Sequence, residues 1–250
     1  QRGLFVYGEA IAGFLPHVNA QLKKAGSPKQ YQNLFGITLG TGFGGGIVRN
    51  GDLFIGDNSA AGEAWLLRNK LEPAVNAEEG CCIRAVRKVY AQKSGISFDQ
   101  APEPKVIYDI GLGAAPGDRP AAVEAFRQLG ESAGDAIAQA LTLVDGLAVI
   151  GGGVSGAHKL FLPALVDAVN DVYHKPGGPQ RRLVPKAFNF EDPAQQEQFL
   201  KGDKRKITVP GSQRQIQYDP LQRTAIGMSR LGTSEAVAVG AYAFALHQLG

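Results

Sequence analysis

Two glycine-rich turns constrain the fold of this 250-residue chain more than any other feature of its sequence. Residues 34–39 form an apolar stretch typical of a strand, glycines follow at 40–46, and residues 46–49 are typical of a second strand. About a hundred residues later, the apolar run 147–150 enters another glycine turn, and a helical pattern begins after Ser155. This strand-turn-strand unit, followed by a strand-turn-helix unit, predicts a phosphate-binding hairpin and a second loop for adenosine.

Each turn matches the pattern Gly-x-Gly-x-x-Gly, but neither has the context of a dinucleotide-binding fold. That fold needs a turn that opens a helix, with an acidic residue about 20 positions later at the end of the next strand. After the first turn Ile47 and Val48 continue as strand, and after the second the candidate acid, Asp171, falls inside the helix. An NAD-dependent enzyme is therefore the least favoured interpretation. The Gly-Lys-Ser/Thr sequence of a P-loop does not occur either.

Together the two turns can bind a nucleotide through their backbones. The N–H groups of a glycine hairpin can surround phosphate oxygens without side-chain bulk, and Thr41 adds a hydroxyl at the tip. At the second turn, the start of a helix would offer free N–H groups and the positive end of the helix dipole. The alternative is that the glycines only make tight turns, and it weakens when both turns occur in this order.

The acidic residue most suggestive of a ligand is Glu63, which lies among small apolar residues at 60–65. This setting predicts a buried carboxylate, and a buried carboxylate needs hydrogen-bond partners. Sugar hydroxyls suit it, because a carboxylate can accept two hydrogen bonds from a diol. Glu78 and Glu79 precede the next helical pattern and either contact the same ligand or simply begin that helix.

Composition excludes several classes of protein. Hydrophobic residues make up 44% of the chain, yet no apolar run reaches the ~18 residues needed to span a bilayer. A net charge of +3 is too small to predict a nucleic-acid partner. Cys81 and Cys82 are adjacent and lack the spaced Cys or His partners of a zinc site, so we expect no metal there but buried thiols in a reducing cytoplasm.

Apolar periodicity and turn signals predict the remaining elements. Besides the strands above, a short strand is expected at 53–55, and helices are expected at 4–25, 83–92, 120–144, from 157 to about 172 and at 233–247. The small residues of the last helix predict close packing between neighbours. Residues 175–223 carry ten basic and five acidic residues, which we interpret as a solvated, partly ordered basic insertion in preference to a nucleic-acid patch.

Three of these segments together resemble the ROK family of sugar kinases and related repressors. They are residues 39–46 with Asn50 and Gly51, residues 61–63, and residues 150–155; residues 232–242 resemble the family's closing helix. The resemblance implies an α/β, ribonuclease H-like or actin-like ATPase lobe with a mixed central sheet flanked by helices. It also implies ATP with Mg²⁺, phosphoryl transfer to a hexose or amino sugar, a cytoplasmic location and a homodimer.

Carried over to this sequence, the resemblance implies a set of site residues. Glu63 and Glu78 would bind the sugar, the phosphates would face the hairpin, and the adenosine would lie near the second turn; the nucleotide residues implied are Gly40, Thr41, Gly42, Gly44, Gly152 and Gly153. No catalytic residue is implied within these 250 residues.

The sequence departs from the family pattern in three places. The family's Gly-Glu-x-Gly-His has Trp65 and Leu66 after Glu63-Ala64, and the Cys-x-Cys-Gly-x-x-Gly-Cys zinc cluster does not occur. Nor do the Asp-x-Gly-Gly-Thr-Lys phosphate loop and the Asn-Asp catalytic pair that would come before residue 4. We therefore expect the large C-terminal lobe of a two-lobe kinase, with negligible activity by itself. The alternative is a sugar-sensing transcriptional regulator built on the same fold.

Overall fold

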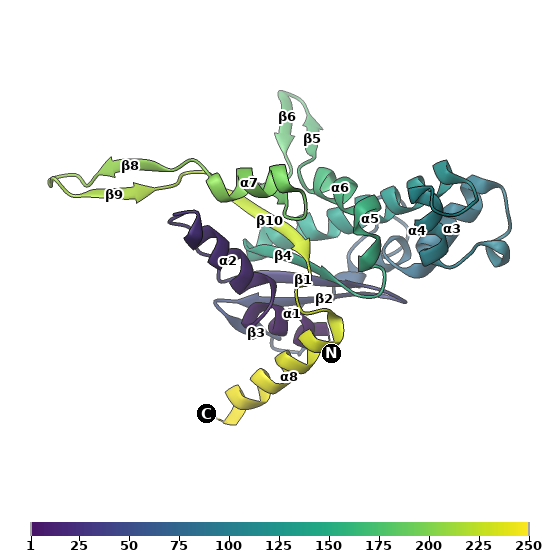
Figure 1. Cartoon of the computed structure of the whole chain (residues 1–250), viewed down its shortest axis with the longest axis horizontal. Helices are drawn as coiled ribbons and strands as arrows, with labels where there is room; N and C mark the ends of the chain where they lie inside the picture. The colour runs from purple at the N-terminus through teal and green to yellow at the C-terminus, as the bar shows by residue number, and fades with distance from the viewer. Residues whose placement is uncertain (1, 250) are drawn as a thin grey trace.

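The computed structural model describes residues 2–249, in which a six-stranded sheet lies between two layers of helices (Figure 1). The strand order is β3-β2-β1-β4-β10-β7. Strands β3, β2 and β1 form an antiparallel meander, whereas β1, β4, β10 and β7 are parallel. The sheet strands are β1 (Leu34–Leu39), β2 (Phe43–Arg49), β3 (Asp52–Phe54), β4 (Leu147–Gly151), β7 (Lys186–Asn189) and β10 (Arg223–Met228). This arrangement confirms the predicted mixed α/β fold class.

Several helices begin or end at capping residues that the sequence supplies. The carboxylate of Asp118 accepts a hydrogen bond from the Ala121 N–H at the start of α5, and Asp192 does the same for Gln195 at the start of α7. The helix α3 ends at Ser94, and Gly95 after it has the left-handed backbone typical of a helix C-cap. The helices are α1 (Arg2–Ile11), α2 (Phe14–Lys24), α3 (Ile83–Ser94), α4 (Pro104–Leu112), α5 (Arg119–Val144), α6 (His158–Val169), α7 (Pro193–Lys201) and α8 (Thr233–Leu249).

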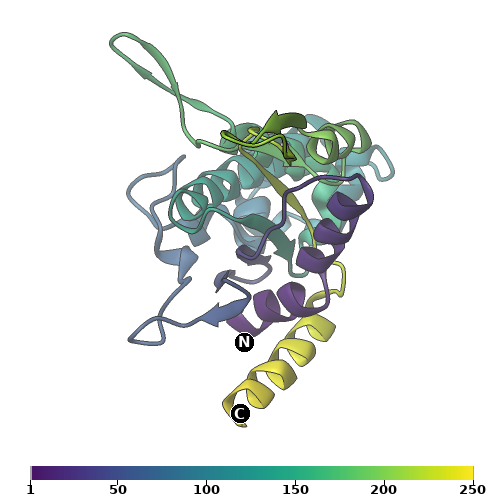
Figure 2. The ribbon, with the colours of Figure 1, turned by 90° about the vertical axis from the view of Figure 1, so that its left-hand side faces the viewer.

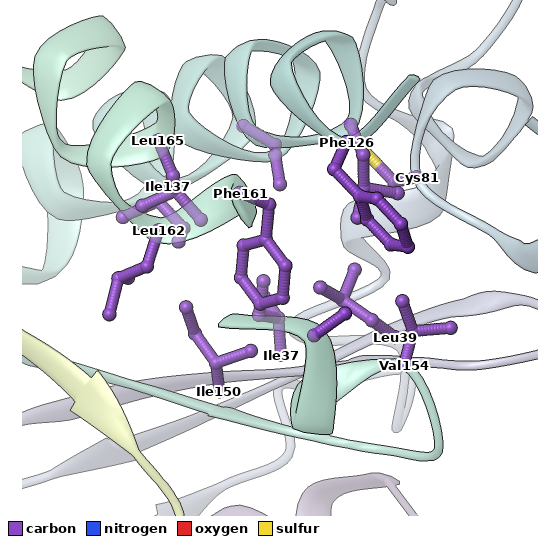
Figure 3. Close-up of a cluster of buried hydrophobic side chains, with 14 of the residues drawn as sticks. Ile37, Leu39, Cys81, Phe126, Ile137, Ile150, Val154, Phe161, Leu162 and Leu165 are labelled. Atoms are coloured by element: carbon purple, nitrogen blue, oxygen red, sulfur yellow. The ribbon is translucent and has the colours of Figure 1, made fainter. Parts of the chain in front are cut away.

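Each face of the sheet has its own hydrophobic core. On one face, Ile37, Leu39 and Ile150 point toward α5 and α6, where they meet Phe126 and Phe161 (Figure 3). The second core joins α1, α2 and α7 to the opposite face, through residues that include Val6, Phe14, Val149, Phe188 and Phe199. Consecutive residues of β1 and β4 are buried, and alternate residues of a strand face opposite sides of the sheet. Both faces of these two strands are therefore covered.

The predicted single helix at 4–25 is wrong at its centre, because two helices form. The Phe14 N–H donates to Oε2 of Glu9 over 2.7 Å, in place of continuing the helix of α1. Gly13 has a non-helical backbone, and a Cβ there would lie 2.2 Å from that same carboxylate oxygen. A local hydrogen bond to a buried acid, Glu9, therefore divides an apolar stripe whose periodicity predicts one continuous helix.

The basic segment 175–223 is not solvated throughout. Two hairpins, β5–β6 (Val172–Lys175 and Gly178–Arg181) and β8–β9 (Arg205–Thr208 and Gln215–Tyr218), project from the body (Figures 1 and 2). Between them, β7 joins the central sheet and α7 buries Phe199 completely. Residues 187–190 and Phe199 are thus part of the core, although the polar composition of the surrounding segment hides it.

The closing helix α8 lies against α1 and extends away from the sheet, as both views show (Figures 1 and 2). The two backbones approach so closely that a Cβ at Gly8 would lie 1.9 Å from the Ala236 carbonyl oxygen, and one at Gly240 would lie 1.9 Å from that of Leu4. The predicted close approach through small residues is confirmed for the α1 side of α8. Its other side exposes Tyr242, Leu246 and Leu249. No helix within residues 2–249 has the length and apolar character needed to cross a bilayer.

Candidate active site

The two glycine turns lie side by side at the carboxyl ends of two adjacent parallel strands. Thr38 in β1 is in register with Gly151 in β4, and the Val154 N–H donates to the Leu39 carbonyl over 3.0 Å. A Cβ at Gly152 would lie 2.2 Å from the Leu39 oxygen, so only glycine permits this contact. The carboxyl ends of parallel strands are where ligands bind in open α/β sheets.

The tip of the first turn is anchored but open to solvent. The Gly40 N–H donates to the Gly42 carbonyl over 3.1 Å, and the Ile83 N–H at the start of α3 donates to the Gly40 carbonyl over 2.9 Å. Thr41 is exposed, whereas Gly44 is buried in β2 opposite Thr38. A Cβ at Gly40 would have no atom of the described chain within 4 Å. Packing therefore does not explain this glycine, and the close approach of a ligand would.

The second turn differs from the prediction in its local structure. A 3₁₀ turn (Ser155–Ala157) comes between the glycines and α6, so the α-helix begins at His158. The Gly152 N–H is not free for a ligand, because it donates to Oγ1 of Thr233 over 2.9 Å. Gly153, in contrast, is exposed, and a Cβ there would also have no atom within 4 Å.

Glu63 lies on a loop that is pressed against β2. Gly62 has a left-handed backbone with φ of 82°, and a Cβ there would lie 2.9 Å from the Cα of Gly46. The expectation that Glu63 is buried is wrong, since its side chain is exposed; one carboxylate oxygen accepts a hydrogen bond from Nε1 of Trp65. The small residues around Glu63 serve the contact with β2 and do not enclose the carboxylate.

A cavity of about 510 Å³ lies beside Glu63. It is bounded by the β2–β3 hairpin, the start of α1 and α8, and its lining includes Gly45, Gly46, Ser59, Glu63 and Phe244. This volume is within the range of small-molecule sites. Among the described residues that line the cavity Glu63 is present, but Glu78 is not.

Glu78 is held at the base of the hairpin. Its Oε2 accepts a hydrogen bond from the Phe43 N–H over 2.9 Å. The neighbouring Glu79 forms an ion pair with Arg84 over 2.6 Å. The structure thus places Glu63 and Glu78 at two points along β2, one beside the cavity and the other beside the glycine tip.

Both cysteines are buried as free thiols. Burial raises the pKa of the Cys81 thiol well above its usual value, since the low-polarity surroundings disfavour the thiolate. Within residues 2–249, no group of three or more His, Cys, Asp or Glu side chains is arranged to hold a metal ion.

Sequence reasoning missed two residues that support the site. Thr233 bonds to the second turn, as described above, and Glu9 is a fully buried carboxylate that binds the backbone before α8. Gly232-Thr233 at the start of the last helix gave a local capping signal but none that pointed to Gly152. Glu9 is a charged residue within the apolar stripe of residues 4–25, and this was the one sequence signal that could have indicated its buried position.

Comparison with known proteins agrees with this geometry. A model of the ROK family matches residues 18–192. The chain belongs to the ROK family. A glucokinase from Parabacteroides distasonis has a similar structure: it is 46% identical to this chain with a TM-score of 0.90, and the match covers 98% of this chain and 67% of that one.

Two more distant structures share the fold alone. A ROK family glucokinase from Streptomyces griseus, solved in complex with glucose and AMPPNP, is 20% identical with a TM-score of 0.52 over 90% of this chain and 65% of that chain. A ROK family transcriptional regulator, a homologue of the E. coli Mlc protein, is 18% identical with a TM-score of 0.57 over 96% and 50%, respectively. This ROK chain therefore spans about two thirds of the kinases and half of the regulator. A search of curated proteins found no match.

Proposed function

We propose that this ROK protein is an ATP-dependent sugar kinase, which transfers the terminal phosphoryl group of ATP to a hydroxyl of a hexose or amino sugar. The observation that carries the proposal is the meeting of the two glycine turns at the ends of β1 and β4, together with a cavity further along β2 that Glu63 lines. The 46% identity to a glucokinase supports it. Because the match spans 67% of that glucokinase, the activity of a complete protein remains part of the proposal.

In this proposal the hairpin holds the phosphates and the second turn lies near the adenosine. Gly40, Thr41, Gly42 and Gly44 form the phosphate side, through backbone N–H groups and the Thr41 hydroxyl. The second turn contributes Gly152 and Gly153. The open space beside Gly40 and Gly153 fits a ligand at both turns. Mg²⁺ would accompany ATP and neutralise phosphate charge during transfer.

The sugar would occupy the cavity beside Glu63. A carboxylate there can accept hydrogen bonds from two hydroxyls, and the Nε1–H of Trp65 orients it. Trp65 also stands where the family pattern has other residues, so its ring is a proposed sugar contact. Glu78 is the second proposed sugar ligand, through the carboxylate oxygen that Phe43 does not use.

Two titrations test the proposal on the 250-residue chain. Trp65 is the single tryptophan, so its fluorescence reports directly on the Glu63 loop when glucose, mannose or N-acetylglucosamine is added. Calorimetry with ADP and Mg²⁺ measures nucleotide binding. We expect both ligands to bind and, since the chain contains no catalytic pair of the family type, negligible turnover of ATP.

Gly40→Val provides the matched control. The Cβ of a valine at this position would meet no atom of the described chain within 4 Å, so we expect unchanged folding, lost ADP binding and a retained sugar response. Lack of ADP binding by the wild-type chain would contradict the kinase proposal. A sugar response without any nucleotide binding would favour the alternative, a sugar-sensing regulator.

The remaining parts of the proposal concern context. We propose that residues 1–250 act as the large lobe of a two-lobe enzyme that closes around the sugar, and that residues 175–223 carry two basic hairpins within it. A homodimer and a cytoplasmic location fit the family and the free thiols. Light scattering coupled to size-exclusion chromatography tests the dimer.

A further inference from the structure

The start of α8 is bonded to the second glycine turn. Oγ1 of Thr233, the first residue of α8, accepts a hydrogen bond from the Gly152 N–H over 2.9 Å. The two residues are 81 positions apart in the sequence. A threonine at a helix start commonly serves the backbone of its own helix, whereas this hydroxyl reaches another segment.

Gly152 is held from two sides. On one side is the end of β1, because the Gly152 backbone approaches the Leu39 carbonyl too closely for a side chain and Val154 donates to the same oxygen. On the other side is Thr233. The Thr233 hydroxyl fixes the peptide between Gly151 and Gly152, because it accepts a hydrogen bond from the N–H of that peptide. The next peptide, which leads into exposed Gly153, is held at its carbonyl by the Ser155 N–H over 3.1 Å, and Gly152 joins the two peptides with φ of 93°, in the left-handed region.

The segment that carries Thr233 is itself fixed by Glu9. This carboxylate is fully buried and accepts hydrogen bonds from the N–H groups of Arg230 and Leu231, each over 3.2 Å, and from the hydroxyl of Ser229. The Ser229 hydroxyl in turn accepts one from the Gly232 N–H over 2.8 Å. Together with the Phe14 N–H, these donors satisfy the buried carboxylate with three backbone N–H groups and a hydroxyl, and those of residues 229–231 hold the connection between β10 and α8 in one conformation.

We propose that Thr233 is a positioning residue of the nucleotide site. Its hydroxyl fixes the Gly152 peptide, and thereby aims the exposed backbone of Gly153 at the nucleotide, while Glu9 holds Thr233 in place. The proposal rests on the proposed function, since it requires that the second turn bind a nucleotide. Without the hydroxyl, the Gly152 N–H loses its acceptor, and the turn keeps its bonds to Leu39 and Ser155 but is no longer fixed from the α8 side.

The test compares Thr233→Val, which has nearly the same shape but no hydroxyl, with Thr233→Ser, which keeps it. Ser234→Ala removes an exposed hydroxyl from the next residue and is the matched control. For each variant, calorimetry gives the Kd for ADP with Mg²⁺, and urea unfolding gives stability. We expect Thr233→Val to raise the Kd for ADP about tenfold. Thr233→Ser and Ser234→Ala should stay within about twofold of wild type. Thr233→Ala repeats the test in case the valine variant does not fold.

The outcomes separate the inference from the proposed function. Wild-type affinity for ADP in the folded valine or alanine variant would overturn the inference and leave the kinase proposal intact. If Thr233 had a purely structural role, its loss would lower the urea midpoint and weaken the sugar response of Trp65 in parallel with ADP binding. That result would also overturn the inference. If the wild-type chain does not bind ADP, both proposals fail.

Discussion

One carboxylate oxygen of Glu78 lies 2.9 Å from the backbone nitrogen of Phe43, the first residue of β2. This hydrogen bond to a charged acceptor anchors the hairpin just after its glycine tip. Glu78→Ala should therefore destabilise the chain by about 1–3 kcal/mol, because the Phe43 N–H is left without its acceptor. The unfolding free energy in urea measures the change.

The neighbouring acid gives the control for this prediction. Glu79 pairs with Arg84 at the surface, so Glu79→Ala should cost less than about 1 kcal/mol. A stable Glu78→Ala variant that has lost its sugar response would contradict the anchoring role and favour Glu78 as a direct sugar ligand.

Gly45 gives a second prediction, about the loop that carries Glu63. A Cβ at this position would lie 2.4 Å from the Gly62 carbonyl oxygen and 2.8 Å from the Cβ of Ala64. Gly45→Ala should push the loop off β2, destabilise the chain by about 1–3 kcal/mol and weaken the sugar response of Trp65 fluorescence. In Gly40→Ala the added methyl meets no atom, so this control should keep both stability and sugar response. Equal behaviour of the two variants would show that the loop does not depend on its contact with β2.

The two thiols provide a third prediction. Cys81 and Cys82 are buried, and burial raises the pKa of Cys81, so the reactive thiolate is scarce and shielded. In the native protein both thiols should react with a disulfide reagent such as DTNB far more slowly than in concentrated urea. In urea, both cysteines of the chain should react immediately. Rapid reaction of either cysteine in the native protein would be inconsistent with the core described for this face of the sheet.

A fourth prediction concerns acid stability. Hydrogen bonds from Arg127 lower the pKa of Glu124 to about 2. Since this pKa is depressed in the folded state, the ion pair stabilises the protein above the ordinary glutamate value and loses its contribution as the pH falls toward 2. Urea midpoints of the wild type and Glu124→Gln should thus differ at neutral pH and converge near pH 2. Glu197→Gln, at an exposed position on α7, is the control. A difference between the urea midpoints of wild type and Glu124→Gln that increases as the pH falls would contradict the sign of the effect.

Much of the fold could be predicted because its signals are local. Apolar runs and the glycines after Leu39 and Ile150 indicated strands and turns, and the structure has β1, β2 and β4 at those places. Helix α5 begins one residue before the predicted range of 120–144, with Asp118 as its N-cap and Pro120 in its first turn. In these segments the preference of each residue for its backbone conformation agrees with the packing around it.

The parts that could not be predicted depend on contacts between distant residues. Residues 186–201 appear polar, yet β7 pairs with β10 and becomes a core strand. In the same way, Glu63 was expected to be buried because its neighbours are small, whereas those neighbours instead allow the loop to touch β2.

By itself the sequence determined that the chain has two glycine turns with strands before them, since the backbone freedom of glycine and the apolar runs act within a few residues. Only the tertiary structure decided what those turns touch. The parallel pairing of β1 with β4 brings the turns together, and the placement of α8 against α1 carries Thr233 to Gly152. Such contacts join residues that are far apart in the chain, so their energies depend on the folded geometry and leave no local pattern to read.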